Sequence, residues 1–143
     1  MSTAIPVSAI EAFRSPFEND VWRCGLVSKA MVDQAIAEGS LLDHAAWNAI
    51  GELTHPNLPS QAQHAARIAY LAQQGWTDAI SIDVGVPALG HFVSWPYEDG
   101  NHRICAAIIR GDTHIEADVS GDIDHAEEIF GVNVIEGFEG EVN

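Results

Sequence analysis

Positively charged side chains are scarce in this 143-residue sequence, which has six Lys and Arg against 21 Asp and Glu and a formal net charge of −15. A surface of that sign repels a polyphosphate, so we expect no direct binding of duplex DNA. The imbalance sharpens towards the end, because residues 112–143 hold ten acidic side chains and no Lys or Arg. This segment is either a solubilising acidic surface or a mimic of nucleic acid that engages a basic partner.

Cysteine is also rare, and long hydrophobic runs are lacking. Cys24 and Cys105 are too few and too far apart in sequence to indicate a disulfide framework or a zinc site. The apolar stretches are interrupted well before the roughly 20 residues that span a bilayer, and no basic-then-apolar signal pattern opens the chain. We therefore expect a cytoplasmic protein that does not engage the membrane.

What is present fits a folded globule, since 47% of the residues are apolar and 19% are charged. A chain of this length matches a typical domain of roughly 100–150 residues. We predict a single domain over residues 1–143, with a helical N-terminal part and an acidic C-terminal segment.

Local signals predict three helices in the first half. They cover residues 29–38, the apolar stripe from Leu42 to Leu53, and the segment between Ser60 and Gly75. Ser28 and Ser60 are suitable N-caps, and Gly39 and Gly75 stand where helices commonly stop. Ahead of these helices, apolar residues 4–10 predict a short strand that Pro6 would confine to a sheet edge or a strand start.

The second half of the sequence alternates between the two-residue hydrophobic period of strands and the 3.6-residue period of helices. Its predicted elements are a strand at 79–84, a loop at 85–90, a strand at 92–97 around Pro96, a buried helix at 101–110, a strand at 113–119, a helix from Asp122 or Ser120 to Phe130, and a short strand with a tail in the last dozen residues. Gly111 and Gly131 mark the two helix ends. The pattern predicts a mixed α/β (α+β) fold in which helices pack on a small sheet.

The most informative segment is the predicted strand-to-helix turn Asp99-Gly100-Asn101-His102-Arg103. The first N–H groups of a helix lack partners inside the helix and bind anions. Gly100 permits a tight turn, Arg103 adds a cation suited to phosphate oxygens, and His102 can exchange a proton near neutral pH. Asp99 could cap the helix or hold a magnesium ion that bridges to phosphates. The competing interpretation is structural: Asp99 caps the helix and Arg103 pairs with it.

These residues resemble a known family. The run Gln74-Gly75-Trp76-Thr77-Asp78-Ala79-Ile80-Ser81-Ile82-Asp83, followed by Glu98 to Ala107 and Gly111, is similar to the N-terminal domain of ParB-type proteins and their sulfiredoxin-like relatives. The resemblance covers roughly residues 64–121. In that family a G-x-x-x-P-I-x-V segment precedes a D-G-x-x-R-x-x-A box that binds nucleotide phosphates.

The resemblance implies that Gly100, Asn101, His102 and Arg103 form a phosphate loop beside the carboxylate of Asp99. It further implies a nucleoside triphosphate, with magnesium at Asp99, and a plasmid, phage or other accessory-gene setting. Asp99 would position metal or water, His102 would contact phosphate or relay a proton, and Arg103 would neutralise charge. Whether hydrolysis follows is left open, and nuclease activity, found in some relatives, is disfavoured by the acidic surface.

This sequence also departs from the family pattern. Ala79 replaces the proline of the first segment, and no helix-turn-helix domain follows, so a role in chromosome partition is not implied. Asn101 stands where sulfiredoxins carry a reactive cysteine, which argues against reduction of sulfinic acids. Cys105 lies in the apolar helix and is expected to be a core residue rather than a nucleophile.

Other chemistry-bearing residues have a plain structural interpretation beside a functional one. His114 and His125, with Asp118, Asp122 and Asp124, match no metal-ligand spacing and are expected to be solvated. His64 has the same interpretation unless the fold brings it near the Asp99 turn. The four tryptophans are expected in the core, although Trp76, Trp95 and Tyr97 could wall a base pocket.

Two functions follow from different observations. The turn predicts a nucleotide-binding ParB-like protein, with or without hydrolysis, whose ligand Arg103 contacts. The charge predicts instead a non-catalytic acidic inhibitor, encoded by a mobile element, that occupies a basic site on a protein partner.

Overall fold

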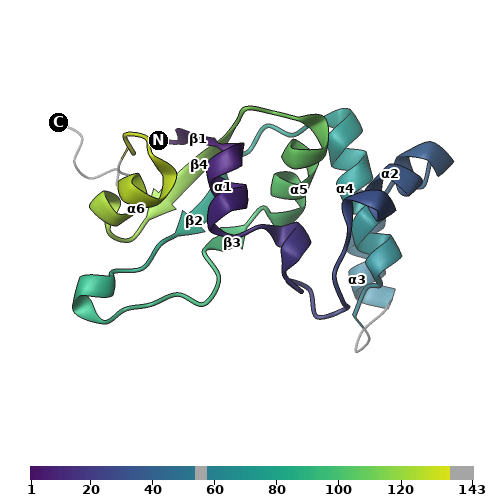
Figure 1. Ribbon diagram of the computed structural model, residues 1–143. Helices are drawn as coiled ribbons and strands as arrows, with labels where there is room; N and C mark the ends of the chain where they lie inside the picture. Colours follow the sequence, from purple (N-terminus) through teal and green to yellow (C-terminus); the bar gives the residue numbers. More distant parts are fainter. Residues whose placement is uncertain (54–57, 136–143) are drawn as a thin grey trace. The chain divides into compact units, whose positions relative to one another are not determined.

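The computed structural model describes residues 1–53 and 58–135, and its fold is mixed α/β, as predicted (Figure 1). By their internal contacts the residues form two compact units. The sheet unit comprises Met1–Phe13, Thr77–Asn101 and Asp112–Asn143, and the helical unit comprises Arg14–Trp76 and His102–Gly111. Neither unit is one continuous segment. Whether the two fold together, as the predicted single domain requires, stays a prediction.

The sheet unit is built on four strands in the order β1-β4-β2-β3. Their bounds are β1 Thr3–Pro6, β2 Ile80–Asp83, β3 Tyr97–Asp99 and β4 His114–Ser120. β4 runs antiparallel to β1 and parallel to β2, and β2 runs antiparallel to β3. The strand alternation of β4 buries Ile115, Ala117 and Val119 and exposes the residues between them.

Two helices complete the described part of the sheet unit, α1 Val7–Phe13 and α6 Ile123–Phe130, besides a short 3-10 turn, η2, at Pro87–Leu89. Phe13 and Phe130 meet edge to face at 6.0 Å between ring centroids, which joins the two helices. Asp122 caps α6 by accepting bonds from the backbone of Asp124 and His125, and Gly131 ends it, as predicted.

The helical unit contains η1 Pro16–Glu18, α2 Lys29–Glu38, α3 His44–Leu53, α4 Gln61–Gln74 and α5 Asn101–Arg110. Both predicted caps are present: the Ser28 side chain accepts from the Met31 amide, and Ser60 forms a reciprocal capping box with Gln63. Asn101, the first residue of α5, is grouped with the sheet unit, and the rest of the helix belongs to the helical unit.

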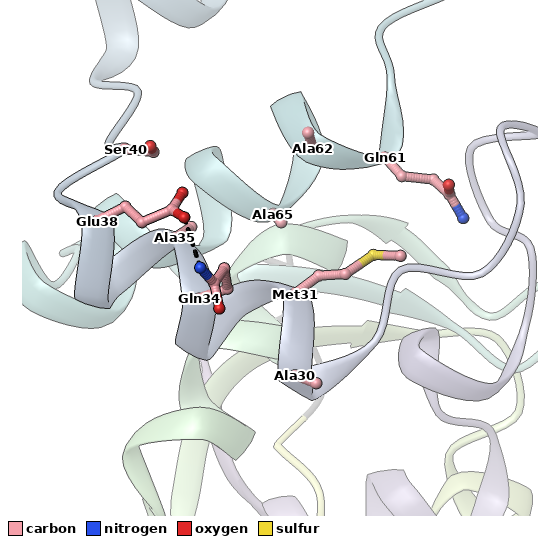
Figure 2. A pocket seen from close by; sticks show the side chains of 9 residues that line it. All are labelled: Ala30, Met31, Gln34, Ala35, Glu38, Ser40, Gln61, Ala62 and Ala65. Carbon is pink, nitrogen blue, oxygen red and sulfur yellow. Dashed lines mark hydrogen bonds between the residues drawn. The ribbon is translucent and has the colours of Figure 1, made fainter.

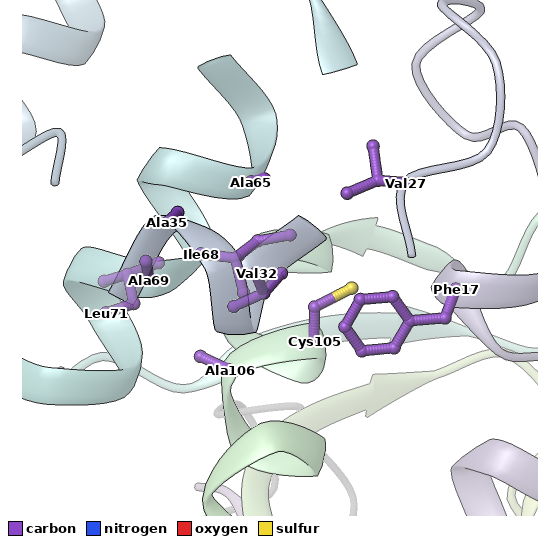
Figure 3. Close-up of a cluster of buried hydrophobic side chains, with 10 residues drawn as sticks. All are labelled: Phe17, Val27, Val32, Ala35, Ala65, Ile68, Ala69, Leu71, Cys105 and Ala106. Carbon is purple, nitrogen blue, oxygen red and sulfur yellow. The ribbon is translucent and has the colours of Figure 1, made fainter. Parts of the chain in front are cut away.

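A cluster of buried apolar side chains forms the core of the helical unit (Figure 3). Its members are Phe17, Val27, Val32, Ala35, Ala65, Ile68, Ala69, Leu71, Cys105 and Ala106. Because α2, α4 and α5 all contribute, this core fixes the positions of the side chains on the neighbouring faces of α4 and α5. Cys105 is fully buried, and burial raises the pKa of its thiol, so the core assignment is confirmed.

Two predicted strands are wrong in part. The opening strand ends at Pro6, and Ala9 and Ile10 lie in α1, where the buried Val7 and Ile10 share a helix face three residues apart. Pro6 does stand on an edge strand, as expected.

The strand predicted at 92–97 is absent, except for Tyr97, which begins β3. Phe92 is 74% exposed, so the apolar run there is not a buried strand. Pro96 accepts a bond from the Asp83 amide but has no N–H to return, which keeps this stretch out of a regular ladder. The predicted tail lies mostly outside the described residues, and residues 131–135 form no strand.

Within residues 1–53 and 58–135, no helix is both long and apolar enough to span a bilayer.

Candidate functional site: the start of α5

The predicted strand-to-helix turn is present. β3 ends at Asp99, Gly100 adopts a φ of 103°, and α5 begins at Asn101. A positive φ of this size strains any residue with a Cβ, so glycine is needed there. The first turn of α5 contains no acidic residue but does contain His102 and Arg103. Cations at the positive end of a helix dipole are unfavourable unless an anion compensates them.

The side chain of Asn101 has a structural task. Its Oδ1 accepts a bond of 2.9 Å from Trp95 Nε1, and its Nδ2 donates at 3.0 Å to the carbonyl of Tyr97. The amide is therefore used at both ends, and Asn101 fixes the chain where β3 passes into α5. Its Nδ2 has a second N–H, so both this group and the backbone N–H remain donors for a phosphate contact.

Asp99 lies on the solvent-facing side of β3, where it pairs with Ser81 of β2. In the described part of the chain no three His, Cys, Asp or Glu side chains are grouped so that they could hold a metal ion. The magnesium role of Asp99 stays a prediction.

Two histidines meet beside the first turn of α5. His64 Nδ1 and His102 Nε2 lie 2.9 Å apart, a hydrogen-bond distance, although 38 residues separate them in sequence. His64 is only 3% exposed, and among the described residues its Nε2 is the one buried side-chain nitrogen or oxygen without a hydrogen-bond partner. The fold thus brings His64 to His102 within the predicted turn, the condition under which His64 becomes a site candidate.

Two half-buried tryptophans enclose the histidine pair. Trp22 stacks on both imidazoles, with centroid distances of 4.4 Å to His64 and 4.6 Å to His102 and interplanar angles of 17° and 9°. Trp47 approaches the same two rings at 5.0 and 4.9 Å, tilted against one and edge-on to the other. These contacts restrict rotation of both imidazoles, and we call the four rings the aromatic cluster.

Arg67 adds a second cation beside Arg103. Burial lowers the pKa of Arg67, and the nearby Arg103 lowers it further, whereas Tyr70 and Asp43 oppose the shift. Arg67 also donates to the Leu42 carbonyl at 3.1 Å and lies over the Tyr70 ring, so it joins α4 to the segment that precedes α3. Two cations that repel each other are thus kept beside one helix N-terminus.

The same surroundings keep both histidines neutral. Burial lowers the pKa of His64 to about 4. Burial lowers the pKa of His102 to about 3, with further contributions from His64, Arg67 and Arg103. At neutral pH each imidazole therefore has one N–H donor and one acceptor nitrogen.

The tryptophans predicted as core residues are only half-buried, and the suggested base-pocket walls lie in different units. In the helical unit, the guanidinium of Arg110 lies over the Trp76 ring at 4.9 Å. In the sheet unit, Trp95 meets Tyr97 edge-on at 5.3 Å between centroids. The tryptophans that do contact the candidate site are Trp22 and Trp47.

A separate groove of about 450 Å³ lies between α2 and α4 (Figure 2). It is lined by Ala30, Met31, Gln34, Ala35, Glu38, Ser40, Gln61, Ala62 and Ala65. Gln34 donates to Glu38 at its rim. Because the lining is mostly apolar and contains no Lys or Arg, it does not suit a phosphate group.

Sequence reasoning found the turn but missed three of the residues around it. Trp22, Trp47 and Arg67 come from distant parts of the chain, and no local pattern ties them to residue 102. The available signal was on α4, where His64 and Arg67 are three residues apart and hence on one helix face.

No protein-family model, curated protein or solved structure matches this chain, so the resemblance to ParB-type and sulfiredoxin-like proteins is left as a prediction.

Proposed function

We propose that this protein binds a nucleotide through its phosphate groups at the start of α5, with Arg67, His102 and Arg103 as the contacting side chains. The proposal follows the ParB-like interpretation of the turn and adds Arg67 from α4.

The observation that carries the proposal is the placement of cations in a chain that has almost none. Only six Lys and Arg are present, yet Arg67 and Arg103 lie close enough for the charge of Arg103 to lower the pKa of Arg67. Two guanidinium groups beside a helix N-terminus attract an anion, because the helix dipole is positive there as well. A phosphate group, with its negative charge and acceptor oxygens, compensates both cations and the helix N-terminus together.

A structural role for Arg67 is the competing explanation, because its bond to Leu42 and its contact with Tyr70 already use part of the guanidinium. A guanidinium carries five N–H donors, so these contacts leave donors for a phosphate. The two explanations differ in what removal of Arg67 does, since only the phosphate-binding role predicts a loss of ligand affinity that exceeds the loss of stability.

The test is calorimetric titration of the purified protein with CTP, ATP, GTP and their diphosphates, with and without magnesium. Arg103→Ala and Arg67→Ala should each weaken binding at least tenfold, because a charge-assisted hydrogen bond contributes about 1.5–3 kcal/mol. Arg110→Ala is the matched control, since Arg110 is the same residue type at the opposite end of α5. Its affinity should equal that of the native protein.

Absence of binding by the native protein to every nucleotide would refute the proposal. Equal losses in Arg103→Ala and Arg110→Ala would show that overall charge, and not the site, attracts the ligand.

Hydrolysis is a separate step of the proposal. Asp99 would position magnesium or water, and His102 would relay a proton. Release of inorganic phosphate from the bound triphosphate should then require magnesium and fall in Asp99→Asn and His102→Asn. Tight binding without phosphate release would restrict the function to binding.

A second candidate function, an acidic inhibitor of a basic partner, is favoured by the distribution of charge. The sheet unit contains 15 of the 21 acidic residues and none of the six Lys and Arg. On one face of its sheet, Glu116 and Asp118 are exposed on β4, and Asp118 pairs with Ser81, whose other neighbour is Asp99. An array of carboxylates on β4 and β3, on either side of Ser81 in β2, is complementary to a surface that binds phosphates.

This candidate predicts that the protein displaces duplex DNA from a basic DNA-binding protein in a salt-sensitive way. The decisive control is polyglutamate of equal total charge. Displacement only by the folded protein, reduced by a Glu116→Gln and Asp118→Asn double variant, would support mimicry. Equal displacement by polyglutamate, or binding that is insensitive to salt, would contradict it.

A further inference from the structure

We infer that His64 is a positioning residue: its Nδ1–H donates to His102 Nε2 and thereby holds His102 in the tautomer whose free nitrogen, Nδ1, carries a proton. The use of that proton, donation to a phosphate oxygen, rests on the proposed function. The tautomer itself does not.

The geometry of the pair is fixed by the helices that carry it. His64 precedes Ala65 in α4, and His102 lies one turn before Cys105 in α5; Ala65 and Cys105 both belong to the buried core (Figure 3). Trp22 stacks on both imidazoles and resists a flip of either ring. The 2.9 Å contact between His64 Nδ1 and His102 Nε2 is therefore a feature of the packed helical unit.

Two neutral imidazoles can share this contact in two ways. If His102 Nε2–H donates, then His64 must carry its own proton on Nε2. If His64 Nδ1–H donates, then His64 Nε2 carries a lone pair, and the proton of His102 is on Nδ1. The two arrangements differ at the nitrogens outside this contact. In the first, His64 Nε2 carries a proton and His102 Nδ1 a lone pair; in the second, these are exchanged.

The buried environment of His64 decides between them. Its Nε2 is enclosed and has no partner among the described residues, so the first arrangement would leave a buried N–H without an acceptor. Orphaned buried N–H groups are rarer in folded proteins than acceptors that lack a donor. The second arrangement, in which His64 Nδ1–H donates, avoids this cost.

The consequence lies at His102. Its Nε2 is used by His64, which leaves Nδ1 for another partner. In the chosen tautomer Nδ1 carries a proton and can donate to a phosphate oxygen, whereas in the other tautomer a lone pair would repel it. Arg67, Arg103 and the backbone of α5 are also donors, so His64 completes a site made of donors alone. Such a site favours a fully ionised terminal phosphate over a protonated group, which would need an acceptor.

The first test needs no ligand. Two-bond ¹H–¹⁵N correlation spectra of the histidine-labelled native protein distinguish an imidazole protonated at Nδ1 from one protonated at Nε2. We expect the Nδ1–H form for both His64 and His102 at pH 7. An Nε2–H form of His102 would overturn the inference.

The second test compares two substitutions at His64, with inorganic pyrophosphate as the probe. In His64→Asn the side-chain amide nitrogen stands as many bonds from the backbone as Nδ1 and keeps a donor. His64→Phe keeps the ring and its stacking but removes the donor. We expect His64→Asn to bind pyrophosphate with an affinity within about threefold of native, and His64→Phe to lose at least tenfold. His102 should shift away from the Nδ1–H form in His64→Phe only.

The outcomes separate the two proposals. If the native protein does not bind pyrophosphate or any nucleotide, the proposed function fails, while the ligand-free spectra still decide the tautomer. If His64→Asn and His64→Phe lose affinity equally while His102 keeps its tautomer in both variants, His64 acts only through packing, and the inference is overturned. If His64→Phe does not fold, as judged by circular dichroism, the spectra of the native protein and of His64→Asn still carry the test.

Discussion

The sheet unit and the helical unit both have an apolar core but differ in their formal charge. The helical unit has six acidic residues and all six Lys and Arg, so its formal charge is zero, whereas the sheet unit accounts for the entire −15. The arginines and neutral histidines of the candidate site lie in the balanced unit, and the acidic array lies in the other. Nucleotide binding and mimicry therefore rest on different side chains and can be tested independently. Asp99 of the sheet unit is shared, because it belongs to the acidic array and is also proposed to act in hydrolysis.

The largest expected effects come from the two cores. Ile68→Ala in the helical unit and Ile82→Ala in the sheet unit each remove three carbons from a fully buried side chain. Each should lower the free energy of unfolding by about 3 kcal/mol. Because neither unit is one continuous segment, we expect a single urea transition that moves in both variants, followed by circular dichroism and by tryptophan fluorescence.

Tryptophan fluorescence reports mainly on the helical unit, which contains Trp22, Trp47 and Trp76, and circular dichroism reports on both units. Two separated transitions, each sensitive to only one of the variants, would show that the units unfold separately and that the predicted single domain is wrong.

Much of the fold was predictable because its signals are local. Ser28 with Gly39, and Ser60 with Gly75, mark helix ends through bonds within a few residues, and both helices were placed to within a residue. The strand order β1-β4-β2-β3 has no such signal, since two of its three pairings, β1 with β4 and β4 with β2, join segments more than 30 residues apart. The strand predicted at residues 92–97 was wrong for the opposite reason: the run is locally apolar, but in the fold Phe92 is exposed and Val93 and Trp95 are only half-buried.

The candidate site is likewise divided between residues that the local sequence predicts and residues that only the fold brings together. Gly100, His102 and Arg103 are consecutive or nearly so, and a glycine before a helix start predicts a turn that can receive an anion. His64, Arg67 and the two stacking tryptophans are brought to that turn only by the packing of α4 on the core. The phosphate contact predicted for Asn101 stays a prediction, and the bonds of its side chain to Trp95 and Tyr97 have no signal in the local sequence.

The next largest effect is a pH dependence that belongs to the helical unit. The pKa values of His64 and His102 are lowered to about 4 and about 3, against about 6.5 in an unfolded chain. Between these values the unfolded chain binds more protons than the folded chain. Stability is therefore complete above about pH 6.5 and falls as the pH drops towards 4. We expect a loss of about 2 kcal/mol between pH 7 and pH 5, after allowance for solvent screening at His102, which is not fully buried.

Urea unfolding at the two pH values measures this loss. About half of it should be absent in His64→Phe, whereas His114→Asn, which changes an exposed histidine of the sheet unit, should behave like the native protein. A loss that is equal in all three proteins would assign the pH dependence to the carboxylates instead.

Helix capping gives a smaller contrast between the units. Ser60→Ala removes half of the capping box of α4 and should cost about 1 kcal/mol. Asp122→Ala removes the N-cap of α6 but also one negative charge from a unit that contains no Lys or Arg, and the second change offsets part of the first. Thermal unfolding at low salt should show a smaller loss for Asp122→Ala, and 0.5 M NaCl should bring the two losses together. If the losses of Ser60→Ala and Asp122→Ala differ by the same amount at both salt concentrations, this account is contradicted.

The smallest effect tests the charge contrast directly. Asp118→Asn on the exposed face of β4 should raise the free energy of unfolding by about 0.5 kcal/mol at low salt, because Glu116 stands two residues away on the same face and the unit contains no Lys or Arg to balance either. Asp33→Asn on the exposed face of α2 is the matched change in the balanced unit and should give no gain, since removal of a carboxylate there also removes attraction to cations. Added salt should abolish the difference, because the screening length at 1 M is about 3 Å. An equal gain from both variants would mean that the acidic residues repel one another across the whole chain, and the charge of the sheet unit would then have no separate effect on stability.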